Sequence, residues 1–113
     1  MHEMAIAESV LEIVESTARG HAATRVSTVW VELGALSAVE PQALAFCFDA
    51  VARGSVADGA ALEIVTLSGE AWCMPCGERV ALARRTDPCP RCGSHQLQVL
   101  RGDEMRVREI AIA

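Results

Sequence analysis

The first part of the chain places its apolar residues at the spacing of an α-helix. These residues recur every three or four positions, and the acidic residues Glu8, Glu12 and Glu15 lie off that stripe. Such a period is typical of an amphipathic helix with one buried face. Gly20, with basic residues on both sides, suits a helix C-terminus. The predicted buried stripe consists of Met4, Ala7, Val10, Leu11, Val14 and Ala18.

The pattern changes after this helix. Residues 26–33 are rich in β-branched side chains and partly alternate, which predicts a strand. Pro41 suits the first position of a second helix, because no intrahelical N–H donor is needed there, and apolar spacing continues to near Gly54. Residues 62–67 alternate again and predict a second strand.

Residues 69–95 interrupt these regular patterns. They contain three of the four prolines together with Gly77 and Gly93, and they lack helical periodicity, so we expect a module built from loops. Apolar residues then alternate on both sides of residues 101–104. This arrangement predicts a hairpin between two final strands.

Together these elements predict an α+β fold. Two helices and a three- to four-stranded sheet would form a small domain from residues 1–68 and 96–113. Residues 69–95 would be a zinc-ribbon-like module inserted between strands. The chain has 113 residues, of which 51% are hydrophobic, and this is enough for one compact core.

Four cysteines give the inserted module a specific chemistry. Cys73 and Cys76 form a first Cys-x-x-Cys hook, and Cys89 and Cys92 form a second hook after twelve intervening residues. Two hooks at this spacing are close to the zinc-ribbon pattern, and four thiolates suit the tetrahedral coordination of Zn²⁺. Because a closed shell of four sulfurs leaves no open coordination position, we expect a structural Zn²⁺.

The composition of the chain also bears on where it works and what it does. No apolar run reaches the roughly 20 residues that span a bilayer, and the amino end shows no export signal. We therefore expect a cytoplasmic protein without membrane insertion. Disulfides are uncommon in that compartment, which favours metal binding by the paired cysteines. The sequence shows no nucleophile elbow, phosphate loop or dinucleotide fingerprint, so we expect no enzyme.

The amino end offers a second set of metal donors. The amine of Met1, the main-chain nitrogen of His2 and the His2 imidazole form adjoining five- and six-membered chelate rings. A deprotonated amide favours square-planar Ni²⁺ or Cu²⁺ over Zn²⁺, whose preference is tetrahedral. The main-chain nitrogen of Glu3, the imidazole of His95 or a group from a partner would complete the coordination.

These features together resemble one known family. The opening Met1-His2-Glu3-Met4, the helix ending at Gly20-His21, the strand Val29–Gly34 and the two late hooks are similar to those of HypA/HybF-family hydrogenase maturation proteins. The resemblance covers nearly the whole chain. It implies a nickel metallochaperone that delivers Ni²⁺ during maturation of nickel-iron hydrogenase and, in some members, serves urease.

The resemblance also implies sites and partners. It assigns the transferred Ni²⁺ to His2, with main-chain nitrogens around Glu3, and structural Zn²⁺ to the cysteines of the two hooks. The implied partners are a HypB-type GTPase, the hydrogenase large subunit as acceptor and, for urease, its accessory proteins. The implied fold is a small α/β nickel-binding domain with an inserted zinc domain.

Three other functions compete with this interpretation. A zinc-ribbon nucleic-acid-binding module is favoured by the four arginines of residues 69–95. However, the rest of the chain holds six basic and twelve acidic residues, and no aromatic residues alternate with basic ones, so we expect no nucleic-acid partner. The same cysteines would also hold iron in a rubredoxin-type electron carrier. A structural adaptor would bind zinc but take up no nickel at His2.

Overall fold

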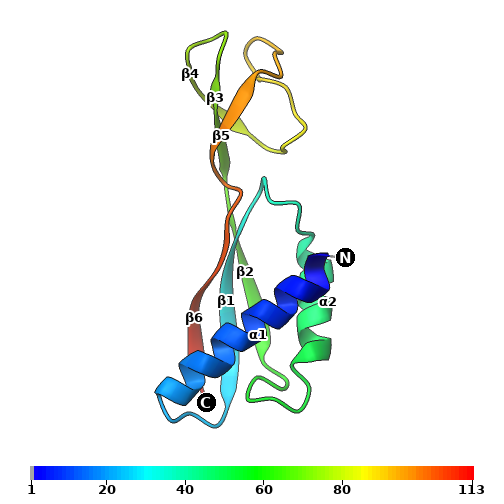
Figure 1. Cartoon of the computed structure of the whole chain (residues 1–113), viewed down its shortest axis with the longest axis vertical. Helices are drawn as coiled ribbons and strands as arrows, with labels where there is room; N and C mark the ends of the chain where they lie inside the picture. Colours follow the sequence, from blue (N-terminus) through cyan, green and yellow to red (C-terminus); the bar gives the residue numbers. More distant parts are fainter. Residues whose placement is uncertain (1) are drawn as a thin grey trace. The chain divides into compact units, whose positions relative to one another are not determined.

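The computed structural model describes residues 2–113, and side chains from Glu3 onward. In chain order the elements are α1 (His2–Gly20), β1 (Val26–Gly34), α2 (Pro41–Val51), β2 (Ala61–Leu67), β3 (Gly69–Cys73), β4 (Glu78–Leu82), β5 (Leu97–Arg101) and β6 (Met105–Ile112), as labelled in Figure 1. In the described part of the chain, no helix has the length and apolar content needed to cross a bilayer.

The chain divides into two compact units. Unit 1 comprises the chain up to Glu32 together with residues 39–65 and 106–113. Unit 2 comprises residues 33–38 and 66–105. The cysteine hooks lie in unit 2, which also includes β5, the last two residues of β1 and the short segment that follows them.

Unit 1 contains both helices, and they contact each other. Helix α1 confirms the helix predicted from the first twenty residues, although Met4 remains 40% exposed. Helix α2 begins at the predicted Pro41. The carboxylate of Glu40 caps α2 by accepting hydrogen bonds from the backbone N–H groups of Gln42 (3.2 Å) and Ala43 (2.9 Å). These bonds satisfy donors that a helix N-terminus leaves without an intrahelical partner.

A three-stranded sheet completes this part of the fold, with β1 between β2 and β6. On β1 the buried residues Val29, Val31 and Leu33 alternate with half-buried ones, as the sequence predicted. Helix α1 is buried at Ala7, Val10, Val14 and Ala18, and α2 at Leu44 and Phe48. The α+β class predicted from sequence is therefore confirmed, with three strands in this sheet.

Unit 2 is built on a second three-stranded sheet, in the order β4-β3-β5. The expectation that residues 69–95 are built only from loops was wrong, because β3 and β4 pair antiparallel from Gly69↔Leu82 to Cys73↔Glu78. One face of this hairpin is buried through Ala71, Val80 and Leu82. Each of these strands has only five residues, which is too short for a clear period in a segment rich in proline and glycine.

The hairpin predicted at residues 101–104 does not form. Strand β5 pairs with β3, whereas β6 lies beside β1, so the two strands belong to different sheets. The residues between them instead bind the segment around the end of β1. The Leu36 N–H donates to the Gly102 carbonyl oxygen (2.7 Å), and the Gly34 N–H donates to the Glu104 carbonyl oxygen (2.8 Å).

Gly34 allows the close approach of these two backbone segments. A Cβ at this position would lie 2.0 Å from the Gly102 carbonyl oxygen. We expect Gly34→Ala to lower the free energy of unfolding by about 3 kcal/mol, because a rigid backbone contact has to move. Denaturant unfolding followed by circular dichroism measures this change. Gly20→Ala is the control, since no atom lies within 4 Å of its added Cβ. Equal losses in the two variants would contradict the prediction.

Candidate metal centre

The first hook is a turn between two paired strands. Cys73 ends β3 and is the register partner of Glu78, which begins β4, so the short connection between them holds Cys76. The Gly77 N–H donates to the Cys73 carbonyl oxygen at 2.8 Å. Gly77 has φ of 64°, a left-handed conformation that glycine adopts without a Cβ penalty. The pairing of β3 with β4 thus brings the two cysteines of this hook to one end of the sheet.

The second hook repeats the same local geometry without flanking strands. The Gly93 N–H donates to the Cys89 carbonyl oxygen (2.9 Å), and Gly93 has φ of 76°. The Cys89 N–H donates to the Ser94 carbonyl oxygen (2.8 Å), which closes the loop on itself. Each hook is therefore a compact turn whose glycine follows the second cysteine.

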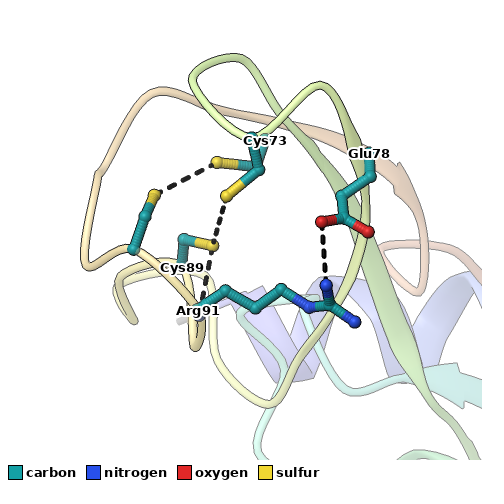
Figure 2. Close-up of polar contacts among 6 residues, drawn as sticks. Cys73, Glu78, Cys89 and Arg91 are labelled. Atoms are coloured by element: carbon teal, nitrogen blue, oxygen red, sulfur yellow. Dashed lines mark hydrogen bonds and ion pairs between the residues drawn. The ribbon is translucent and has the colours of Figure 1, made fainter.

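The sulfur atoms of the two hooks converge. The Sγ atoms of Cys73 and Cys92 are 3.5 Å apart, and those of Cys76 and Cys89 are 3.9 Å apart (Figure 2). All four sulfurs lie within 4.8 Å of one another. Zn–S bonds of about 2.3 Å in a regular tetrahedron place the sulfurs about 3.8 Å apart. The four residues predicted as zinc ligands thus have the donor type, number and spacing that Zn²⁺ needs.

The pKa values of three of these thiols are shifted, and not all in the same direction. Burial raises the pKa of the Cys73 thiol. Hydrogen bonding with the Cys92 and Cys73 sulfurs raises the pKa of Cys76 to about 12. In contrast, the backbone N–H of Cys92 lowers the pKa of Cys89 to about 7. Metal-free protein therefore retains thiol protons at neutral pH that a metal ion has to displace.

Three of the four cysteines lie in or against the hydrophobic core of unit 2. Cys73 and Cys89 are buried in one cluster with Leu36, Val80 and Leu82. Cys76 packs against this cluster and remains partly buried, whereas Cys92 is exposed. A metal at this position would consequently link the end of the β3–β4 hairpin to the second hook, inside the core against which Leu36 packs.

Two charged residues beside the cysteines were not singled out from sequence. The Arg91 guanidinium pairs with the Glu78 carboxylate at 2.8 Å, and the Arg91 N–H donates to Cys89 Sγ at 3.4 Å. From sequence, Arg91 was counted only among the four arginines of residues 69–95. The opposite charges of Arg91 and Glu78, each close to one hook in sequence, were a weak indication that the two side chains are in contact. The spacing of the cysteines gives no such indication.

The predicted nickel site lies at the edge of the described region. Met1 and the side chain of His2 are outside the described residues, while the main chain of His2 begins α1. The Glu3 carboxylate accepts a hydrogen bond from the Glu40 backbone N–H (3.0 Å), and this bond lowers the pKa of Glu3. Sequence reasoning had considered only the main-chain nitrogen of Glu3. His95 is exposed in unit 2, just after the second hook.

Comparison with known proteins assigns the chain to a family. Residues 1–112 match the family described as "Hydrogenase/urease nickel incorporation, metallochaperone, hypA". The hydrogenase maturation factor HypA of Rhodopseudomonas palustris (strain BisB5) is 57% identical over 112 residues, covering 99% of both chains. That of Azotobacter vinelandii is 54% identical, with 99% of both chains covered.

Solved structures agree with this assignment. The solution structure of the Ni metallochaperone HypA from Helicobacter pylori superposes with a TM-score of 0.69 and 25% identity, over 97% of this chain and 96% of that one. Another HypA solution structure gives a TM-score of 0.70, also at 25% identity, over 100% of this chain and 97% of that one. With its cluster of four cysteines suited to structural zinc, the chain belongs to the HypA family of nickel metallochaperones for hydrogenase maturation.

Proposed function

We propose that this protein carries Ni²⁺ at its amino end to a hydrogenase precursor while a separate Zn²⁺ stabilises unit 2. The observation that carries the proposal is the match of residues 1–112 to a nickel-incorporation family, in a chain whose four cysteine sulfurs lie within 4.8 Å of one another. A closed sulfur shell suits an ion that stays bound. The transferred ion therefore needs another set of donors.

The proposed nickel ligands are His2 and the main-chain nitrogens of Met1, His2 and Glu3, with His95 as a further candidate. The position of His2 at the start of α1 supports this set, because donors adjacent in sequence reach one ion without help from distant elements. The contact between Glu3 and the Glu40 N–H ties the first turn of α1 to the residue before α2. This tie fixes the position of Glu3, whose main-chain nitrogen is one of the proposed donors.

The proposed zinc ligands are Cys73, Cys76, Cys89 and Cys92. Their sulfurs surround a point in unit 2, and two of the four residues are buried in its core. Bound Zn²⁺ supplies cross-linking and no catalysis. We further propose that residues 69–95 are the segment whose folding depends on zinc, and that residues 1–68 and 96–113 form the nickel-binding domain.

We assign the protein a carrier role without a catalytic step of its own. The acceptor would be the large subunit of nickel-iron hydrogenase, loaded together with a HypB-type GTPase, and urease accessory proteins would be further partners. The family description, which names both hydrogenase and urease, supports these two enzymes as destinations. We place this work in the cytoplasm, without nucleic-acid or membrane partners.

Metal analysis tests the proposed function directly. Untagged protein that begins at Met1 is incubated with Ni²⁺ and Zn²⁺ together and freed of excess metal. We expect one equivalent of each ion, because the nitrogen donors favour nickel and the sulfur cluster favours zinc. Protein that retained zinc but no nickel would be a structural adaptor, and a red iron-containing protein would be an electron carrier.

Zinc binding should release protons in a way that identifies the ligands. Cys73 and Cys76, the latter with a pKa of about 12, hold protons at neutral pH in the metal-free protein. Zinc affinity should therefore rise as pH rises through the neutral range and fall on acidification. Calorimetry in buffers of different ionisation enthalpy counts the protons released. Cys76→Ser should release fewer than the parent, whereas Cys47→Ser, in α2, should match it. Equal proton release by Cys76→Ser and the parent would exclude Cys76 as a ligand.

A further inference from the structure

Arg91 and Glu78 form an ion pair that joins the two hooks. Arg91 lies inside the second hook, and Glu78 is the first residue of β4, two positions after the last cysteine of the first hook. The distance from Arg91 Nη1 to Glu78 Oε2 is 2.8 Å (Figure 2). This value lies in the range of charge-assisted hydrogen bonds. The pair therefore connects the hooks through side chains that are not candidate metal ligands.

The main chain and the side chain of Arg91 have different partners. The Arg91 N–H donates to Cys89 Sγ at 3.4 Å, whereas the guanidinium extends to the Glu78 carboxylate (Figure 2). A second link runs from the Met74 N–H in the first hook to the Gln96 carbonyl oxygen, beyond the second hook (3.0 Å). The second hook has no flanking strands of its own, so its movement away from the first would break the ion pair.

We propose that the Arg91–Glu78 ion pair is an electrostatic latch that slows separation of the two hooks and thereby slows loss of zinc. The pair acts by holding the second hook, which carries Arg91, against the start of β4, which carries Glu78. Both are positioning residues, and the inference rests on the four-cysteine zinc site proposed above.

The solvent exposure of the pair determines how much it changes the rate of zinc release and how strongly that change depends on salt. The side chains of Arg91 and Glu78 are 64% and 43% exposed. Exposed ion pairs are weak and are screened by salt, so the expected change in zinc release is only about two- to fivefold. It should vanish at about 1 M salt, where the Debye length falls to about 3 Å. If either side chain acted only through its shape, the change in zinc release on its substitution would persist at high salt.

The test measures transfer of zinc from the full-length, zinc-loaded protein to an excess of a chromogenic chelator, at low salt and at about 1 M salt. At low salt, Arg91→Gln and Glu78→Gln should each release zinc about threefold faster than the parent, and the double variant no faster than either. The charge-swapped variant, Glu78→Arg with Arg91→Glu, should return towards the parental rate. All rates should converge at high salt.

Arg79→Gln is the matched control. Arg79 is exposed to a similar degree and pairs with Glu70 at 3.7 Å on the same sheet, but this pair does not join the hooks. Its zinc release should equal that of the parent. Additive single-variant effects, no recovery on charge swapping, or differences that persist in high salt would each overturn the latch. A parent that held no zinc would instead contradict the proposed zinc site, and the nickel content of the parent tests the carrier role independently.

Discussion

Removal of zinc by a strong chelator should unfold the cysteine-bearing segment and leave the helices of unit 1 intact. Cys73 and Cys89 are buried in the core of unit 2, so the protein loses the cross-link at the centre of that core. Apparent zinc binding in small finger peptides is worth about 10–16 kcal/mol. Whole domains are stable by only about 5–15 kcal/mol, so a sheet of short strands has little to replace the metal.

Hydrogen exchange read residue by residue measures this effect. Amides of residues 69–95, including those paired between β3 and β4, should lose protection after chelation, whereas amides of α1 and β1 should keep it. Cys73→Ser should reproduce the loss without chelator. Cys47→Ser is the matched control, because Cys47 lies in α2 of unit 1, away from the sulfur cluster. Unchanged protection of residues 69–95 in fully zinc-free protein would exclude a structural role for the metal.

The helices and the first strand were predictable because their patterns are local and long. Helix α1 carries its apolar stripe along a helix of nineteen residues, and β1 alternates from Thr28 to Leu33 within its nine residues. The signal at β3 and β4 was present but weak. Buried Ala71, Cys73, Val80 and Leu82 alternate with more exposed neighbours, yet each strand covers only five residues. Turn-forming residues between the strands therefore outweighed the alternation.

The predicted hairpin failed for a different physical reason. Residues 101–104 have suitable turn chemistry, and alternating residues flank them, so local pattern alone favours pairing of the two strands. Pairing is decided by which faces can be buried, and this depends on partners far away in sequence. Strand β5 pairs with β3, whereas β6 pairs with β1. Gly34 has no Cβ, so the Gly102 carbonyl group can approach its backbone closely. No local signal contains these long-range choices.

The candidate zinc ligands were predictable from spacing, but their surroundings were not. A pair of Cys-x-x-Cys hooks specifies four donors because each hook places two sulfurs on one turn. The packing of Leu36 against Cys73 and Cys89 joins residues more than thirty positions apart. The Arg91–Glu78 pair likewise depends on how the second hook is seated against the strands. Both features arise from tertiary structure and leave little trace in the sequence.

Substitution of His2 by alanine should abolish high-affinity nickel binding and leave zinc content unchanged. The variant removes the imidazole and with it one chelate ring. The affinity loss should exceed the 10- to 100-fold that is typical when only a residue supporting a metal ligand is removed. Zinc should be unaffected, because its proposed ligands are four sulfurs in unit 2. Equilibrium titration with Ni²⁺, beside metal analysis for zinc, measures both quantities.

Matched variants separate the proposed donors. His21→Ala should bind nickel like the parent, because His21 lies just beyond the C-terminal end of α1, where its ring contacts the Thr17 carbonyl oxygen. His95→Ala should weaken nickel binding only if His95 completes the coordination. Acetylation of the Met1 amine should lower the affinity as His2→Ala does, since the proposed chelate needs an unblocked amine. Binding in the parent should also weaken on acidification, because protons compete for amine, amide and imidazole nitrogens. Nickel binding that survived both His2→Ala and acetylation would place the transferred ion elsewhere in the protein.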